Sequence, residues 1–384
     1  MVSNFVSDVV ASLLDGTIND GVVNDALKPG WIQTVEAANE AYKPGTFTTF
    51  AGYEFTSSTD EREALHRNVI FRGAERLPAQ PFSRFNSMNP EGLWDWMDAL
   101  RKQDIESLAI PHNSNGSNGA MFMFTDWAGN AIDQEYADQR MRNEPLVEIT
   151  QVKGTSDTHP LLSRNDEWAN FEIFPLRTST RISSNPRGSY VRNAWLRGLS
   201  MAESAAANPY KFGAIGSSDT HTGAASLQED NYFGKIGTFD DTAEKRGSIP
   251  ASFLYGTLVK LDAPEMVEVV DDQTYLDFSG YKYWGASGIA GVWAEENTRD
   301  QGADQISNPA QHDDGERLHG QRKADRGINR KQHRIEHGGD GDDAGSEREG
   351  QRVHPVGFDT ADRGAGMILG HCPHGAPEPA LLDV

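Results

Sequence analysis

Apolar positions in the first 300 residues occur either at helical spacing or in short unbroken runs. Residues 31–43 have helical spacing, and a Pro-Gly pair at 44–45 ends the pattern. The segment NPE at 89–91 supplies a cap, a proline for the first helical position and an acid for the first turn. It predicts a helix over residues 92–102, and a third amphipathic helix is expected over 189–205.

Short apolar runs between these helices predict strands, because they are rich in β-branched and aromatic residues. The runs cover residues 46–55, 68–71, 105–110, 146–152 and 210–215. Strands and helices alternate, and polar residues repeatedly follow the strands. This order predicts a parallel α/β sheet or barrel.

Five side chains that commonly bind metals stand at the ends of these predicted strands or just past them. They are Glu54, His66, His112, Asp219 and His221. The carboxyl ends of parallel strands are where catalytic groups collect. Imidazole and carboxylate without sulfur suit Zn, Mn or Fe better than Ca or Mg, and Glu54 could bridge two ions. Each residue also has a plainer interpretation as a packing histidine, a surface acid or a turn cap.

Other polar residues beside these positions have two interpretations each. Lys153 ends an apolar strand and Arg67 follows a candidate ligand, so either could pair with the oxygens of a tetrahedral anion. Arg67 equally fits a surface salt bridge. Asn113 could hydrogen-bond a substrate oxygen or cap the following turn, and His159 lies in a loop, which favours a structural or solvent-exposed role.

Composition narrows the classes of partner. The chain of 384 residues carries 57 acidic and 35 basic residues, a formal charge of −22, so we expect neither nucleic-acid nor membrane partners. The single cysteine, Cys372, excludes an intrachain disulfide and a thiolate zinc cage. No apolar run approaches the ~18 residues of a membrane span. The first residues do not read as a signal peptide, which leaves cytoplasmic and periplasmic locations both open.

The composition changes near residue 300. From residue 301 to residue 384 the only aromatic residue is Phe358, and the same stretch holds seven of the 11 histidines. Such a segment buries too little apolar surface to offset the entropy of ordering. We therefore predict a domain over residues 1–300 and a tail over 301–384 that is disordered or translated out of frame.

Several blocks of the sequence resemble, in order, the later metal-binding motifs of the PHP superfamily, which is named for polymerase and histidinol-phosphatase domains. These motifs are Tyr53-Glu54, His66, IPH at 110–112 and GSSDTH at 216–221. Longer blocks resemble one PHP-like family, catalogued as domain of unknown function 3604. They are GYEFTS at 52–57, LHRNVIF at 65–71, NPYKFG at 208–213 and GVWAEENTR at 291–299, within a likeness over about 30–300.

The resemblance implies a distorted TIM-like (β/α)7 barrel with two or more metal ions at the carboxyl ends of its strands. It implies hydrolysis of small anionic esters, either phosphate esters or, in this branch, sulfate esters, by a metal-activated water. In this resemblance Glu54 would bridge two ions, and His66, His112, Asp219 and His221 would be terminal or bridging ligands.

The sequence departs from the PHP pattern at its amino end, because it contains neither the early His-x-His pair nor the following Asp-His. We therefore expect a truncated, incomplete barrel whose exposed strand edges favour homo-oligomers. A metal-dependent ester hydrolase is the leading prediction. The alternatives are an inactive fragment or binding module that retains part of the metal site, and an amidohydrolase-like enzyme.

Overall fold

The computed structural model describes residues 20–205, 207–221, 234–278, 280–284, 290–292, 294–307, 369–370 and 380–382. All of them belong to one compact unit. Most of the predicted tail, including Phe358 and Cys372, lies outside the described residues. Among the helices described, none is long and apolar enough to cross a membrane.

The central sheet contains three strands in the order β2-β3-β4, and both pairs are antiparallel. The strands are β2 (Gly52–Phe55), β3 (Arg67–Phe71) and β4 (Ser107–Pro111). Arg67 is paired with Phe55 on one side and with Pro111 on the other. The carboxyl ends of β2 and β4 and the amino end of β3 therefore share one edge of the sheet.

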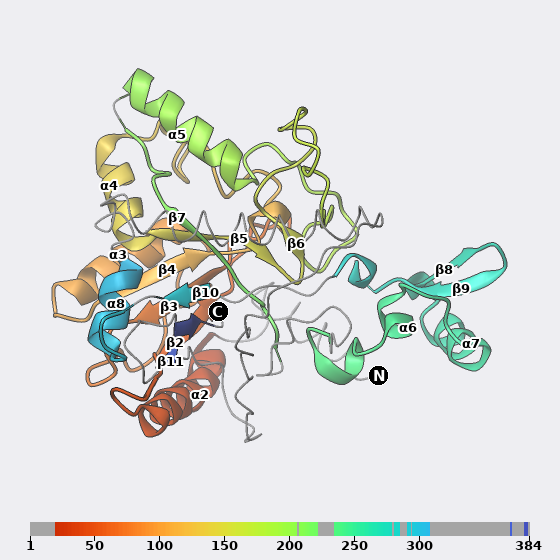
Figure 1. Ribbon diagram of the computed structural model, residues 1–384, viewed down its shortest axis with the longest axis horizontal. Helices are drawn as coiled ribbons and strands as arrows, with labels where there is room; N and C mark the ends of the chain where they lie inside the picture. The colour runs from red at the N-terminus through yellow and green to blue at the C-terminus, as the bar shows by residue number, and fades with distance from the viewer. Residues whose placement is uncertain are drawn as a thin grey trace, which may run out of the picture. The chain divides into compact units, whose positions relative to one another are not determined.

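A second sheet has the order β6-β5-β7 and lies beside the first, with β5 next to β4 (Figure 1). Its strands are β5 (Leu146–Gln151), β6 (Gly154–Thr155) and β7 (Gly213–Gly216). β5 pairs with β7 in parallel and with β6 antiparallel. The remaining strands form short antiparallel pairs. They are β1 (Phe47–Thr48) with β11 (Leu369–Gly370), β8 (Val267–Val270) with β9 (Gln273–Leu276), and β10 (Ala290–Val292) with β12 (Ala380–Leu382).

The described part of the chain is thus a mixed α/β fold with small sheets, and these residues form no closed barrel. The expectation of parallel strands is wrong for the central sheet, where only antiparallel pairs occur. A parallel connection needs a crossover of about a dozen or more residues, usually with a helix. The link between β2 and β3, residues 56–66, contains no helix, so the chain turns back and pairs antiparallel.

The helices are α2 (Asp20–Ala41), α3 (Pro90–Arg101), α4 (Gln134–Asn143), α5 (Val191–Ala205), α6 (Ala243–Arg246), α7 (Phe253–Asp262) and α8 (Arg299–Ser307). Short 3-10 turns lie at Ser114–Gly116, Gly237–Phe239, Pro264–Met266 and Tyr281–Tyr283. All three predicted helices are confirmed, as α2, α3 and α5. At α3, the side chain of Asn89 accepts a hydrogen bond from the backbone N–H of Glu91 at 2.9 Å, as the NPE segment predicts.

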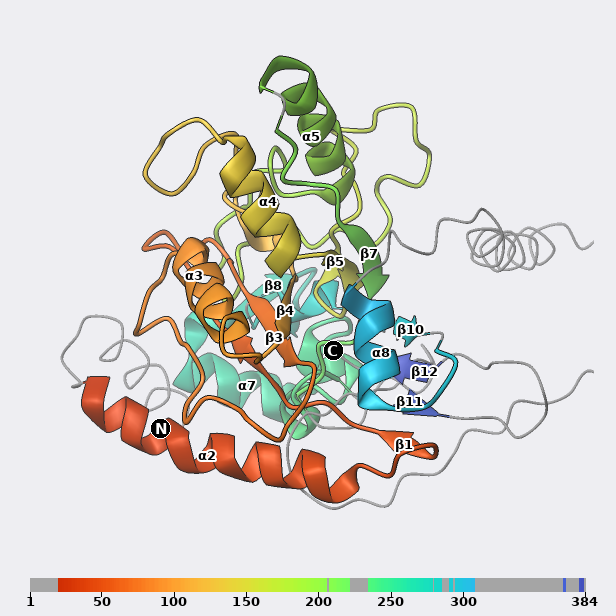
Figure 2. The ribbon, with the colours of Figure 1, turned by 90° about the vertical axis from the view of Figure 1, so that its left-hand side faces the viewer.

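Apolar side chains pack on both faces of the central sheet, and β3 and β4 are largely buried. One face packs under α2 and α3 through residues such as Trp31, Val69 and Met97. The other face carries Ile70 and Ile110. Figure 2 shows α3 and α4 beside each other and against β4.

The predicted domain boundary at residue 300 falls inside α8. Two side chains of this helix, Ala303 and Ile306, are only 5% and 4% exposed and belong to the same cluster as Phe50 and Leu108. The folded domain therefore extends to the end of α8, and residues 301–307 do not belong to a disordered tail. The abrupt loss of aromatic residues misplaces the boundary because two small or aliphatic side chains are enough to dock one helical face.

We expect Ile306→Ala to reduce the free energy of unfolding by about 2–5 kcal/mol, because it leaves a cavity in the core beneath α8. The neighbouring change Gln305→Ala, at a half-buried polar position, is the matched control and should change stability by less than ~0.5 kcal/mol. Urea unfolding at neutral pH measures both. Equal, small effects of the two changes would mean that α8 does not contribute to the core.

Candidate metal centre

Three predicted ligands meet at one edge of the central sheet. Glu54 lies in β2, His66 immediately precedes β3, and His112 immediately follows β4. The backbone N–H of His112 donates to the carbonyl of His66 at 3.2 Å, so the pairing of β3 with β4 continues by one row. Because paired residues share a face and alternate residues share a face, the antiparallel register places all three side chains on the same side of the sheet.

The geometry of this group, here called the triad, suits a divalent ion. His66 Nδ1 lies 2.7 Å from Oε1 of Glu54, and His112 Nε2 lies 3.4 Å from the same oxygen. One ligand atom from each of the three residues lies within 4.8 Å of the others. Two imidazoles and one carboxylate form a donor set that fits Zn, Mn or Fe.

The protonation states also suit metal binding. Burial opposes ionisation of Glu54, but His66 and His112 outweigh it and hold the pKa of Glu54 well below its usual range. Burial lowers the pKa of His66, even though Glu54 attracts its proton, so this imidazole favours the neutral form that binds metal. Burial also lowers the pKa of His112, but Glu54 outweighs burial and the net pKa is raised. A metal ion bound by Glu54 and His112 would take the place of the proton that His112 otherwise holds.

A second charged cluster surrounds Asp219. The ammonium group of Lys153, two residues past β5, forms an ion pair with Oδ2 of Asp219, and Lys235 Nζ lies 2.6 Å from the same oxygen. Burial opposes ionisation of Asp219, but the two lysines hold its pKa far below the usual range. His221 Nδ1 lies 3.9 Å from Oδ1 of Asp219, and the histidine side chain is 51% exposed.

Asp219 and His221 are neighbours in space, as their spacing predicts, but an extended strand is not the reason. β7 ends at Gly216, and Asp219 has a left-handed backbone with φ of 53°. Asp tolerates this conformation better than most residues. The charge of Lys153 acts on both Glu54 and His66, so this cluster and the triad share one electrostatic environment.

A buried carboxylate, Glu148 of β5, connects the loops that carry the two clusters. Its Oε1 accepts the backbone N–H of Asn113 at 3.0 Å, and its Oε2 accepts the hydroxyl of Ser217. Burial raises the pKa of Glu148. Glu148 and Lys235 are not among the residues that the sequence predicts for the site. A carboxylate inside an apolar strand indicates a buried side chain with hydrogen-bond partners. No pattern in the sequence around Lys235 distinguishes it from other lysines.

The other predicted residues have structural partners. The side chain of Asn113 donates to Asn115 Oδ1 at 2.6 Å and accepts from Thr178 Oγ1 at 3.1 Å, which holds the turn after β4. His159 accepts the backbone N–H of Leu161 at 3.2 Å and packs against Tyr190. The contacts of His159 match its structural alternative, whereas the side chain of Asn113 has partners but makes no capping hydrogen bond to the turn at Ser114–Gly116.

Arg67 forms a salt bridge, but a buried one rather than the surface pair that the sequence left open. Its Nε lies 2.8 Å from Oε1 of Glu144, and Arg140 Nε lies 3.1 Å from Oε2. Trp94 donates to the same carboxylate at 2.8 Å. Because Arg67 follows His66 directly in the chain, its side chain points to the opposite face of the sheet. The structure therefore separates Arg67 from the triad.

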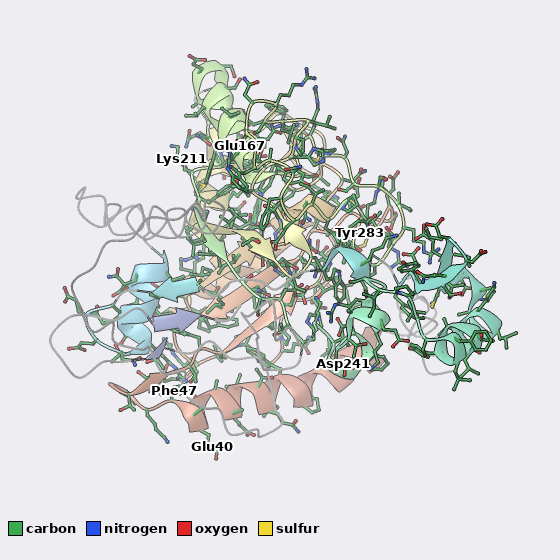
Figure 3. The ribbon with its side chains drawn as sticks, turned by 45° about the vertical axis from the view of Figure 1, so that its right-hand side comes forward. Glu40, Phe47, Glu167, Lys211, Asp241 and Tyr283 are labelled. Atoms are coloured by element: carbon green, nitrogen blue, oxygen red, sulfur yellow. The ribbon has the colours of Figure 1, made fainter. Side chains whose placement is uncertain are left out.

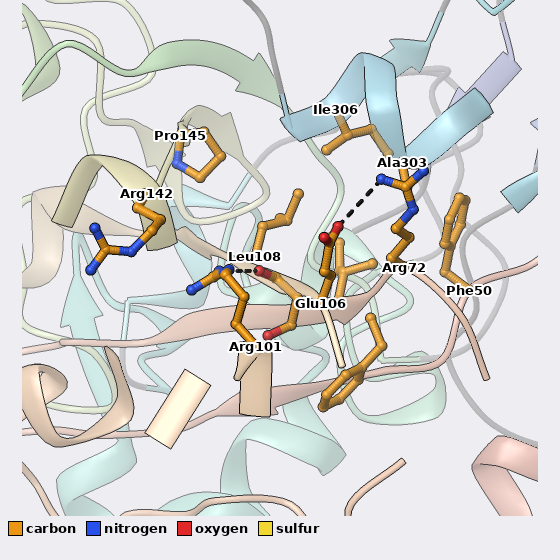
Figure 4. Close-up of a pocket in the computed structure, with 12 residues that line it drawn as sticks. Phe50, Arg72, Arg101, Glu106, Leu108, Arg142, Pro145, Ala303 and Ile306 are labelled. Carbon is orange, nitrogen blue, oxygen red and sulfur yellow. Dashed lines mark hydrogen bonds and ion pairs between the residues drawn. The ribbon is translucent and has the colours of Figure 1, made fainter. Parts of the chain in front are cut away.

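A cavity of about 140 Å³ lies at the opposite edge of the central sheet, where β3 ends and β4 begins (Figure 4). Three arginines line it, and each is already paired. Arg72 contacts Glu106 at 3.3 Å, while Arg101 and Arg142 both contact Asp98, at 2.5 and 2.6 Å. The cavity lies at the end of the sheet away from the triad, so it is not part of the candidate metal centre.

Fold and site together define a mixed α/β protein with a candidate divalent-metal centre at a sheet edge. The chain matches the family described as "Protein of unknown function (DUF3604)" over residues 1–308, so it belongs to this family. The predicted resemblance to this family is therefore confirmed, over a longer range than the 30–300 expected. No curated protein and no solved structure matches the chain.

The buried pair of Arg67 and Glu144 generates a stability prediction. Burial opposes ionisation of Glu144, but Arg67 and Arg140 outweigh it and lower the pKa below the ordinary value. A carboxyl with a lowered folded-state pKa stabilises the fold above its unfolded pKa and loses this effect as the pH falls. We expect Glu144→Gln to cost about 3–5 kcal/mol at pH ~7, because it leaves two buried guanidinium groups without a counter-charge.

Glu106→Gln is the matched control, because Glu106 is 54% exposed and pairs with Arg72 at the surface. It should cost less than ~1 kcal/mol. Urea unfolding measured from neutral to acid pH distinguishes the two. The stability of Glu144→Gln should also depend less on pH in the acid range than that of the unmodified protein. An undiminished acid dependence in this variant would contradict the assignment.

Proposed function

We propose that this protein is a metal-dependent hydrolase of phosphate or sulfate esters. Glu54, His66 and His112 would hold a divalent ion, and Lys153 and Lys235 would bind the anionic oxygens of the substrate. The observation that carries the proposal is the triad itself, with three ligand atoms within 4.8 Å of one another. Its carboxylate is held ionised by its two histidines.

A divalent ion held by the triad supplies a water of lowered pKa and polarises an ester oxygen. The chain's own residues account for the rest of the proposed chemistry. Lys153 and Lys235 each have side chains only 7% exposed, so their charges act in a poorly hydrated environment where they attract an anion strongly. Asp219 holds both ammonium groups in place, because its Oδ2 contacts each of them.

We further propose that the family is related to the PHP superfamily and that its complete fold is a distorted barrel. The order of the motifs around Glu54, His66, His112 and residues 216–221 supports this proposal. The absence of His-x-His from the sequence favours a second candidate, a metal-binding module without turnover. Assay of aryl phosphates, aryl sulfates and amides distinguishes the hydrolase from this module and from an amidohydrolase-like enzyme.

We expect Glu54→Gln to weaken the binding of Zn or Mn by more than ~100-fold, because loss of a supporting hydrogen bond alone costs 10–100-fold. Isothermal titration and elemental analysis of the purified protein measure this loss. Glu135→Gln, on the exposed surface of α4, is the matched control and should bind as the unmodified protein does. Unchanged affinity in Glu54→Gln would exclude the triad as the metal site.

We expect Lys153→Met and Lys235→Met each to raise the inhibition constant of inorganic phosphate about tenfold or more. A hydrogen bond to a charged group contributes about 1.5–3 kcal/mol, which corresponds to this factor. Lys211→Met is the control, since Lys211 is exposed and has no part in the cluster (Figure 3). If all three variants are inhibited equally, the lysine pair does not bind the anion.

The same assay should depend on pH. Burial lowers the pKa of Lys235 to about 8, although Asp219 opposes this shift. With inorganic sulfate as the inhibitor, inhibition should therefore weaken as the pH rises from ~7 to ~9, because sulfate keeps its charge in this range while Lys235 loses its own. Lys235→Met should lack this alkaline change, and its persistence in that variant would assign it to another group.

A further inference from the structure

We infer that Lys153 and Lys235 take the place of a second metal ion, so that this protein binds one divalent ion per chain. The inference rests on the proposed metal site at the triad. It differs from the arrangement expected from the family resemblance, in which two or more ions share Glu54, Asp219 and His221. The contacts of Asp219 are the starting point.

The carboxylate of Asp219 is already occupied by cations of the chain itself. Its Oδ2 accepts hydrogen bonds from both ammonium groups, and the Lys235 contact is 2.6 Å. Its Oδ1 lies 3.9 Å from Nδ1 of His221. Within the described residues, the triad is the group of three or more acidic, histidine or cysteine side chains whose ligand atoms converge. Among the residues that the structure describes, Asp219 and His221 offer two ligands, and no third ligand atom converges with them to complete a second site.

The positive charges around Asp219 lead to the same conclusion. A second divalent ion on Asp219 would stand beside two ammonium groups whose side chains are each 7% exposed. Repulsion between like charges is strong where water is largely excluded. The ion would therefore have to displace both lysines from their ion pairs with Asp219.

The lysines lie where a second cation would be useful. Lys153 is at the end of β5, and its charge acts on Glu54 and His66 of the triad as well as on Asp219. Its charge therefore acts on the triad and on Asp219 at the same time. Two ammonium groups can neutralise the oxygens of an anionic ester in the way that a second ion does in two-metal sites.

The test uses the whole chain without any substitution. The protein is stripped with a chelator, saturated with Mn²⁺, freed of excess metal and measured by elemental analysis and electron paramagnetic resonance. We expect one equivalent of Mn²⁺ with the spectrum of an isolated ion. Two or more equivalents, with the spectrum of an exchange-coupled pair, would overturn the inference while leaving the proposed hydrolase intact.

Other outcomes separate the inference from the proposed function. If the protein binds none of Mn²⁺, Zn²⁺ and Fe²⁺ in parallel samples, both the single-ion centre and the proposed hydrolase are refuted. One equivalent without turnover of aryl phosphates or sulfates supports the single-ion centre and refutes the hydrolase.

Two variants locate the ion. We expect Asp219→Asn to retain one equivalent, because Asp219 binds lysines, and Glu54→Gln to lose it. Circular dichroism confirms that each variant is folded before metal is counted. A folded Asp219→Asn protein that loses its metal would overturn the inference. If this variant does not fold, the measurement on the unmodified chain decides the question by itself.

Discussion

The antiparallel pairing of β3 with both of its neighbours is the constraint on which the candidate site depends. The pairing of Arg67 with Phe55 and Pro111 brings the end of β2, the start of β3 and the end of β4 to one edge. A shift of the register by one residue would move a candidate ligand to the opposite face. The apolar clusters on both faces oppose such a shift, because it would move residues such as Val69 or Ile70 out of the cluster in which each of them packs. The stability of the core and the geometry of the triad therefore have the same origin.

Buried charge is the second organising feature, and the two buried carboxylates Glu148 and Asp219 both have partners within the site. Glu148 uses both carboxylate oxygens to hold Asn113 and Ser217, which fixes the loops after β4 and β7 relative to β5. Asp219 balances Lys153 and Lys235. An unpaired buried polar group costs about 1–3 kcal/mol, so these loops gain order from the same hydrogen bonds that hold the charges. The site is consequently built before any ligand enters it.

The sequence predicts local structure well and long-range pairing poorly. The helix after NPE at 89–91 follows from local capping chemistry, and α3 begins there. The direction of β4 does not follow, because the long connection that contains α3 permits either direction. The grouping of Glu54, His66 and His112 is predicted correctly although the parallel sheet is not, since candidate ligands at strand ends meet at an edge in both topologies. Lys235 carries no local signal, because its role comes only from its position opposite Asp219.

Lysines and metal ions differ as sources of positive charge, and this difference decides how the charge of the site depends on metal concentration and on pH. A bound ion exchanges with solution, and its occupancy depends on metal concentration, whereas Lys153 and Lys235 are always present. Their charge depends instead on protonation, and burial has already lowered the pKa of Lys235 to about 8. A centre with one ion and two lysines therefore needs less metal to reach its full positive charge and is more sensitive to alkaline pH. One ion held by a carboxylate and two imidazoles still leaves positions for water and substrate.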